Sequence, residues 1–110
     1  FLFIFCKGWL QKDMSAARFD QQPVAACATL LAFLKAYNIT HKDIYRHYAQ
    51  ICFAWYTGKN ISNLSLIDAE CGGCYDGITA DGLNKNEGAE SLISWIIANI
   101  MMQKISKPNS

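Results

Sequence analysis

A polar, glycine-rich connector of about thirty residues, 58–88, separates two apolar stretches of this chain, whereas helix–helix connections usually have two to eight residues. The sequence from Cys71 to Ser91 reads CGGCYDGITADGLNKNEGAES and contains carboxylates, carboxamides and closely spaced glycines. Packing a hydrophobic core does not require such polar side chains. Connectors of this length that persist in compact domains are usually functional or disordered. We therefore expect a functional site in this connector.

The stretches on either side of the connector have the periodicity of helices. Pro23 suits the first turn of a helix over 23–37, a run that is apolar nearly all round. A second helix is expected over 41–57, with Thr40 as its N-cap and Gly58 as its stop.

Two further helices are expected at the ends of the chain. One covers 2–12, and the other runs from a cap at Asn86 or Gly88 to about Ile105. The buried stripe expected on the last helix is Leu92, Trp95, Ile96, Ile100 and Met101. The pattern predicts an all-α fold of about four antiparallel helices, with a short extended piece over 64–67.

The composition restricts the domain organisation and the partners. At 110 residues the chain forms one domain, and 52% hydrophobic against 17% charged residues is apolar for that size. Some of its faces are therefore expected to meet another copy or a missing part of a longer protein. A net charge of +1 without a basic stripe gives no reason to expect nucleic acid or an anionic membrane as a partner.

The first ten residues, FLFIFCKGWL, are apolar but too short to span a bilayer, and they lack the features of a secretory signal. We expect a cytoplasmic location. The chain does not begin with Met, so we expect residues 1–110 to be one helical domain from a longer protein. The apolar helix over 2–12 is then the expected surface for a homo-oligomer.

The five cysteines have two different settings. Cys6, Cys27 and Cys52 lie in apolar runs and are expected to be small buried residues, whereas Cys71 and Cys74 form a C-x-x-C pair. That pair is compatible with structural thiols, with a disulfide or redox pair, and with half of a zinc site. Zinc would need a second ligand pair, and redox pairs usually open a helix, so we predict structural thiols with no metal and no cofactor.

The order of the helices places the connector near another polar segment. If successive helices are antiparallel neighbours, the loops over 13–22 and 58–88 lie at the same end of the bundle. A polar rim is therefore expected from the side chains of Asp20, Gln21, Gln22, Asp76, Asn84, Asn86 and Glu90.

Four blocks of sequence occur in a specific order: FDQQPVAA, FAWYTGKN, GGCYDG and GLNKNEGAES. This series resembles the C-terminal helical region of some bacterial glycosyltransferases and related carbohydrate-active proteins, which is similar to (α/α)6-toroid domains. The resemblance covers about 18–97. It implies helical hairpins and a link to carbohydrate. A closed toroid needs about twelve helices and about four fit here, so any glycosyltransferase or glycosidase activity would be incomplete in this chain alone.

The resemblance also implies which positions bind substrate. Its polar positions here are Asp20, Gln22, Tyr75, Asp76, Asn84, Asn86, Glu90 and Ser91. This chain departs from the family pattern at three positions, where Cys71 replaces Thr, Glu87 replaces Gln and Leu92 replaces Thr. The resemblance therefore speaks for the fold more directly than for an activity.

Each candidate residue also has a structural interpretation. Asp76 and Glu90 would form the carboxylate pair of a glycosidase, or they cap a turn and a helix N-terminus. Asn84 and Asn86 would bind sugar hydroxyls, or they form turns. Gln21 and Gln22 would line the same pocket, or they are solvated. The tryptophans, Trp9, Trp55 and Trp95, would stack on sugar rings, or they belong to the core.

Two hypotheses follow from the sequence. In the first, the chain is a carbohydrate-associated module that binds a saccharide at the rim formed by 13–22 and 58–88. In the alternative, it is a catalytically silent structural module that self-associates. An independent hydrolase that uses Asp76 and Glu90 is a third possibility.

Overall fold

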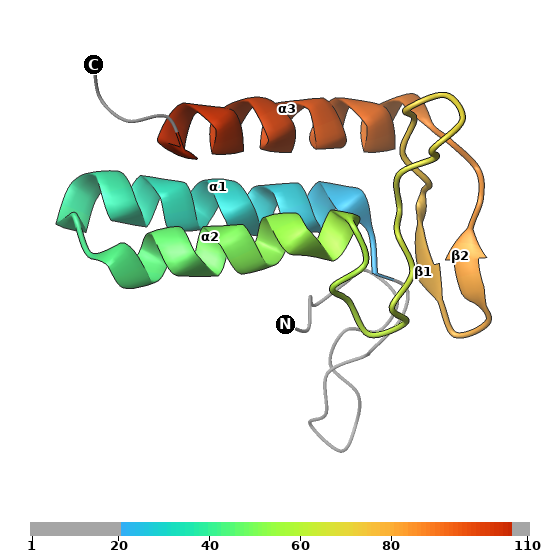
Figure 1. The fold of residues 1–110 in the computed structure, drawn as a ribbon, viewed down its shortest axis with the longest axis horizontal. Coiled ribbons are helices and arrows are strands. Elements are labelled where there is room, and N and C mark those ends of the chain that lie inside the picture. Colours follow the sequence, from blue (N-terminus) through green and yellow to red (C-terminus); the bar gives the residue numbers. More distant parts are fainter. Residues whose placement is uncertain (1–20, 107–110) are drawn as a thin grey trace.

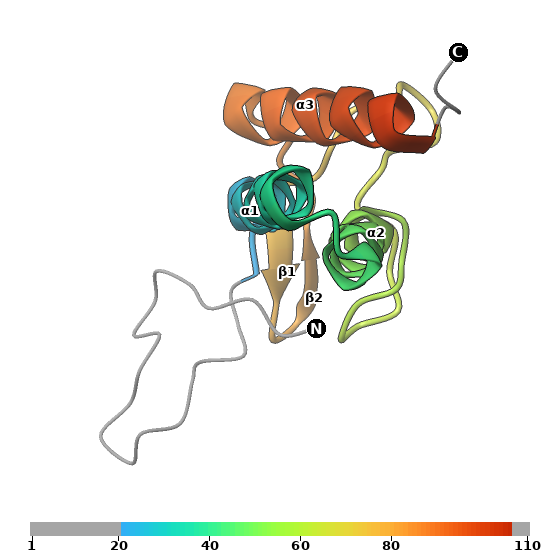
Figure 2. The same cartoon turned by 90° about the vertical axis from the view of Figure 1, so that its left-hand side faces the viewer.

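The computed structural model describes residues 21–106, and it has three helices and one hairpin in that range. The helices are α1 (Pro23–Thr40), α2 (Asp43–Tyr56) and α3 (Ala89–Ser106), and the antiparallel strands are β1 (Gly77–Thr79) and β2 (Gly82–Asn84). α1 and α2 form an antiparallel pair, and α3 lies along the other side of α1 (Figures 1 and 2). The described chain is therefore mostly helical, as predicted, with a small sheet added. The helix expected over 2–12 lies outside the described residues.

The connection between α1 and α2 differs from the prediction in detail. α1 continues three residues beyond the predicted end, and Thr40 is its last residue instead of the N-cap of the next helix. The Thr40 hydroxyl donates a hydrogen bond to the Ala36 carbonyl at 2.8 Å. His41 then takes the left-handed conformation, with φ 56°, and its N–H closes the last turn on the Tyr37 carbonyl at 2.7 Å. Only two residues separate the helices, so the turn at this end is tight.

The hairpin is the element that the all-α prediction lacks. Ile78 pairs with Leu83, and the turn between the strands ends at Gly82, whose φ is 121°. The Asp81–Gly82 sequence is a known hairpin signal, and glycine tolerates this φ without steric cost. No strand is assigned over 64–67, where a short extended piece was expected, but Ile67 forms an isolated bridge with Cys74. The long connector is therefore an ordered structure tied to the helices.

The core lies where the three helices and the connector meet. Trp55 and Tyr56 at the end of α2 are the largest fully buried side chains. Cys27 and Cys52 are buried, as predicted. The core members are Ala26, Leu30, Leu34, Ala49, Cys52, Trp55, Tyr56, Leu66, Cys74, Ile78, Ala98 and Met102.

The predicted buried stripe of α3 is largely wrong. The side of α3 that faces the core contains small residues and one methionine, namely Ser91, Ser94, Ala98 and Met102. Trp95 and Met101 are half-buried beside this core, but Leu92, Ile96 and Ile100 are exposed. α3 is apolar nearly all round, and the periodicity of such a helix does not identify the core-facing side.

α1 also has the length and composition of a membrane-spanning helix, with 18 residues and a mean hydropathy of 1.3. The core helix of a soluble protein has the same properties, and α1 buries Leu30 and Leu34 against the rest of the chain. The absence of a membrane partner therefore stays a prediction.

Candidate functional site

Gln21 joins the start of α1 to the hairpin and to α2. Its backbone N–H and C=O form two hydrogen bonds with Ile78, at 2.9 and 2.8 Å, and its side-chain Oε1 accepts one from Trp55 Nε1 at 2.9 Å. Gln21 is fully buried, so it is neither a solvated residue nor part of the lining of a pocket. A Cβ on Gly77 would lie 2.5 Å from the Gln21 carbonyl oxygen, and glycine therefore permits this close approach of two backbone segments.

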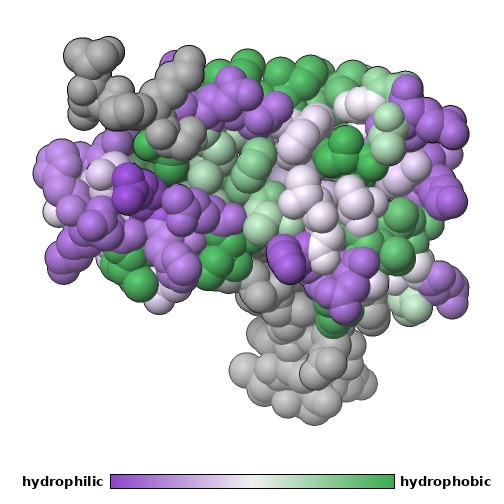
Figure 3. All heavy atoms as spheres, viewed as in Figure 1, coloured by the Kyte–Doolittle hydropathy of each residue, from purple (hydrophilic) through white to green (hydrophobic). Residues whose placement is uncertain are grey.

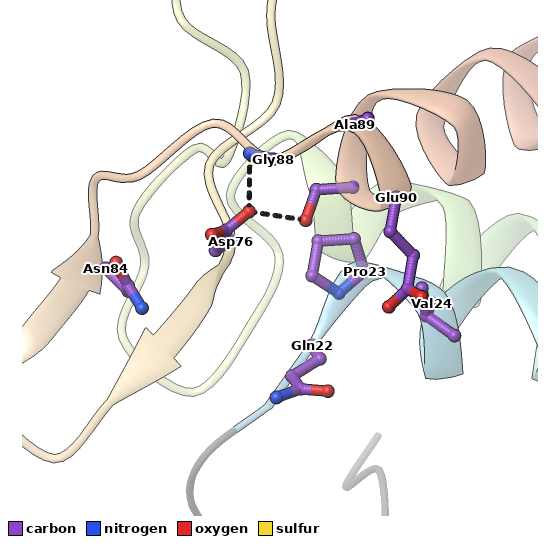
Figure 4. A pocket seen from close by; sticks show the side chains of 9 residues that line it. Gln22, Pro23, Val24, Asp76, Asn84, Gly88, Ala89 and Glu90 are labelled. Carbon is purple, nitrogen blue, oxygen red and sulfur yellow. Dashed lines mark hydrogen bonds between the residues drawn. The ribbon is translucent and has the colours of Figure 1, made fainter.

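Asp76 joins the connector to the first turn of α3. Its Oδ1 accepts hydrogen bonds from the Gly88 N–H and from the Ser91 hydroxyl, both at 2.8 Å (Figure 4). The N–H groups in the first turn of a helix lack partners within the helix, and its N-terminus favours a negative charge. The cap expected at Gly88 is thus supplemented by a carboxylate from earlier in the same connector. This supports the structural interpretation of Asp76 and fixes the position of its carboxylate.

A pocket of about 380 Å³ lies between the start of α1, the hairpin and the start of α3 (Figure 4). Its lining residues come from three separate segments: Gln22, Pro23, Val24, Asp76, Asn84, Gly88, Ala89, Glu90 and Ser91. Four of the predicted rim residues are therefore brought together, namely Gln22, Asp76, Asn84 and Glu90. In Figure 4 the Asp76 carboxylate points toward Gly88, whereas the Glu90 side chain points toward Val24.

The other predicted site residues do not line this pocket. Asp20 lies outside the described residues. Asn86 is exposed, and its carbonyl accepts a hydrogen bond from the Asp76 N–H at 2.8 Å, which agrees with a role in the turn. Tyr75 is half-buried, and partial burial together with the nearby Asp68 and Glu87 carboxylates raises its pKa.

Neither tryptophan of the described chain lines the pocket either. Trp55 is fully buried, and Trp95 stacks on Phe53 with ring centroids 5.4 Å apart. The structural interpretation of both is supported, because each belongs to the packing between helices. The pocket therefore has no aromatic platform among the residues that the structure describes.

A buried hydrogen-bond network behind the pocket holds the three helices together. The Tyr56 hydroxyl donates to the Pro23 carbonyl at 2.7 Å and lies 3.3 Å from the Ser94 hydroxyl, which in turn donates to the Ser91 carbonyl at 2.8 Å. Burial raises the pKa of Tyr56, so this phenol stays protonated. Neither Tyr56 nor Ser94 is among the site residues predicted from the sequence. The helix period gives no signal for Ser94, because the buried stripe predicted for α3 does not include it.

The chemistry available in the pocket is hydrogen bonding. Gln22 and Asn84 supply carboxamides, and Glu90 supplies an exposed carboxylate in the first turn of α3. Asp76 Oδ1 already accepts two hydrogen bonds, while no hydrogen bond to its Oδ2 is found among residues 21–106. Such a set of donors and acceptors is suited to a neutral ligand with several hydroxyl groups. No histidine, cysteine or lysine contributes to the described lining, so a nucleophile of those types is not part of it.

A second polar cluster lies in the connector, outside this pocket. The ligand atoms of Asp68, Cys71 and Glu87 lie within 4.8 Å of one another, and Cys71 Sγ is 3.4 Å from a carboxylate oxygen of each acid. These are groups that could bind a metal ion, but exposed acidic groups often cluster without one. Cys71 is exposed, Cys74 is buried with its pKa raised to about 12, and both are free thiols. This agrees with structural thiols.

We expect Cys71 to react slowly with alkylating reagents although it is exposed. The Gly73 N–H lowers the pKa of the Cys71 thiol, but the Asp68 and Glu87 carboxylates raise it, and the net change is upward. Only the thiolate reacts, and below the pKa its fraction falls tenfold per pH unit. Glu87→Gln removes one of these negative charges, so the alkylation rate at pH 8 should rise about threefold.

The rate is measured by iodoacetamide alkylation followed by mass spectrometry of the peptide that contains Cys71. Glu70→Gln is the matched control, because Glu70 is an exposed acid close in sequence that forms no hydrogen bond with Cys71 in the described chain. Equal rates in the two variants would contradict the assignment of Glu87.

The fold and the pocket define a small, mostly helical protein with a polar pocket at one end of its helices. No family model and no curated protein sequence matches the chain. The function must therefore be argued from the pocket and from the sequence resemblance.

Proposed function

We propose that this chain is a carbohydrate-associated helical module that binds a saccharide in the pocket between the start of α1, the hairpin and the start of α3. The observation that carries the proposal is the convergence of Gln22, at the start of α1, with Asp76, Asn84 and Glu90, from the stretch 76–91, on one pocket. The sequence blocks that resemble the helical region of bacterial glycosyltransferases contain these four residues. The pocket and the resemblance thus support the same ligand class.

The lining is suited to sugar hydroxyls for a chemical reason. Each hydroxyl both donates and accepts, so a site for several of them needs carboxamides, which do both, and carboxylates, which accept. Asn84 and Gln22 provide the first kind of group, and Glu90 and Asp76 provide the second. At about 380 Å³ the pocket is large enough for a small ligand, and pockets of about 300 Å³ and more commonly bind one.

Catalysis by Asp76 and Glu90 is the weaker part of this proposal. A glycosidase needs an acid and a second carboxylate that face each other across the glycosidic bond. Asp76 holds the start of α3 through Gly88 and Ser91, and Glu90 points toward α1 (Figure 4). We therefore propose binding by this chain, with any glycosyltransferase-related activity requiring the rest of a longer, toroid-like protein in the cytoplasm.

The binding proposal is tested with a pair of neighbouring asparagines. Asn84 lines the pocket, whereas Asn86 is also exposed but lies outside it. Asn84→Ala should weaken saccharide binding about fivefold, since one neutral hydrogen bond contributes about 1 kcal/mol, and Asn86→Ala should leave it unchanged.

Binding is measured by saturation-transfer difference NMR of a panel of mono- and disaccharides at millimolar concentration. Circular dichroism of both variants provides the folding control. Equal loss in the two variants, or no transfer to any sugar from the wild type, would contradict the proposal.

A further inference from the structure

α3 has a second apolar side that no other described element covers. Its core-facing side is formed by Ser91, Ser94, Ala98 and Met102, and the opposite side exposes Ile93 by 55% and Ile100 by 49%. Leu92, Ile96 and Ile97 are exposed on the same side. Figures 1 and 2 show α3 at the edge of the molecule, and Figure 3 shows hydrophobic residues along that edge. A helix that is apolar all round is normally buried all round.

The exposed side has a regular pattern with opposite charges at its two ends. Glu90, Ile93, Ile97, Ile100 and Lys104 follow one another at intervals of three, four, three and four residues. This spacing places them in one stripe along the helix, as in the seam of a coiled coil. Ile97 is at its centre, with Glu90 seven residues before it and Lys104 seven residues after it. Among the residues that the structure describes, neither charged side chain forms an ion pair.

We propose that a second copy of this chain covers the stripe, with the two α3 helices antiparallel about a two-fold axis at Ile97. In this arrangement Glu90 of each copy faces Lys104 of the other at both ends of the contact, and the isoleucines pack between them. A parallel arrangement would place like charges together. Two-fold contacts of this self-complementary kind are the commonest in homo-oligomers. The interface differs from the one expected over 2–12, and it shares Glu90 with the proposed saccharide pocket, so dimerisation is measured without saccharide.

A groove beside the stripe extends the contact surface onto α1. It has a volume of about 490 Å³ and lies between α1 and α3. Most of its lining is apolar: Val24, Cys27, Ala28, Leu31, Glu90, Ile93, Ser94 and Ile97. Ala28 is exposed in this groove, although it belongs to a helix that is apolar nearly all round. Apolar side chains from the second copy would therefore find a continuous surface from α3 to α1.

Glu90 and Lys104 also have a role within α3 that the experiment must separate from pairing. An acid in the first turn and a base in the last turn both stabilise a helix through its dipole. Reversal of one charge removes the stabilisation at that end of the helix, and reversal of both charges removes it at both ends. Only pairing between copies predicts that the double reversal restores the dimer affinity that each single reversal lowers.

The test is sedimentation equilibrium of the full chain from micromolar to millimolar concentration. The wild type should dimerise, Glu90→Lys and Lys104→Glu should each weaken the dimer about tenfold, and the double variant should recover to within about threefold of the wild type. Ile97→Asp places two like charges at the axis and should leave a monomer. Lys42→Glu, an exposed charge between α1 and α2, is the matched control and should dimerise like the wild type.

Circular dichroism shows that each variant retains its helices, which separates loss of the dimer from loss of the fold. A wild type that stays monomeric at millimolar concentration would overturn the proposal, as would a double variant no better than the single ones. Sedimentation of the monomer with phosphatidylcholine vesicles would also overturn it and would assign this side of α3 to a lipid surface.

Discussion

Replacing Trp55 with alanine should lower the free energy of unfolding by about 4 kcal/mol, the largest effect that we expect from one substitution in this chain. The side chain is fully buried at the end of α2 and packs edge-on against Tyr56, with ring centroids 5.3 Å apart. Its removal leaves a cavity and takes away the hydrogen-bond donor to Gln21 Oε1. The total free energy of unfolding of a native protein is about 5–15 kcal/mol, so this substitution would remove much of the stability. Urea unfolding followed by circular dichroism measures it.

Trp95→Ala is the matched control for this prediction. Trp95 is half-buried and stacks on Phe53, so its loss should cost about 1–2 kcal/mol. A second variant, Gln21→Ala, should cost about 2 kcal/mol, because it leaves the Trp55 N–H buried without this acceptor. An equal or larger cost for Trp95→Ala would show that the core is centred elsewhere.

Replacing Gly77 with alanine should cost about 3 kcal/mol although the substitution adds one methyl group to a connector. The new Cβ would lie 2.5 Å from the Gln21 carbonyl oxygen, which accepts a hydrogen bond from the Ile78 N–H, and the Gln21 N–H donates a second one back to Ile78. Neither backbone segment has room to move, and overpacking of this kind typically costs 1–3 kcal/mol or more. Thermal and urea unfolding both measure the loss.

Gly73→Ala distinguishes this steric cause from a general intolerance of the connector. Its Cβ would contact the Glu87 carboxylate, which is the end of a flexible and exposed side chain that can rotate away. Neither Gly73 nor Gly77 has a positive φ, so alanine can adopt the backbone conformation at both positions. We expect less than about 1 kcal/mol for Gly73→Ala. Similar costs at the two positions would contradict the close approach between Gln21 and Gly77.

The helices could be predicted from the sequence because their local signals agree. Pro23 begins α1, and Gly58 follows the end of α2. The hairpin was missed because each strand has only three residues, and glycines at 77 and 82 remove the alternation that predicts a strand. The Asp81–Gly82 turn was the one signal present. Thr40 was assigned to the wrong helix because threonine suits an N-cap as well as a hydrogen bond to a carbonyl four residues before it.

The candidate site was predictable to the extent that it follows from the order of the helices. Antiparallel neighbours bring Gln22 and Asp76 to the same end, and both line the pocket. The fully buried position of Gln21 was not predictable, because its partners Trp55 and Ile78 come from distant segments. The core-facing side of α3 could not be read from a helix that is apolar all round.

The binding of a saccharide in the pocket at the start of α1 and α3 is tested most directly by ¹⁵N chemical-shift mapping during titration with the saccharide panel. We expect the shifts to cluster at the backbone amides of Gln22, Asp76, Asn84, Gly88 and Ser91, with no change at His41 and Lys42 at the far end of the helices. The absence of shifts at millimolar sugar, or shifts confined to the far end, would contradict the proposed site.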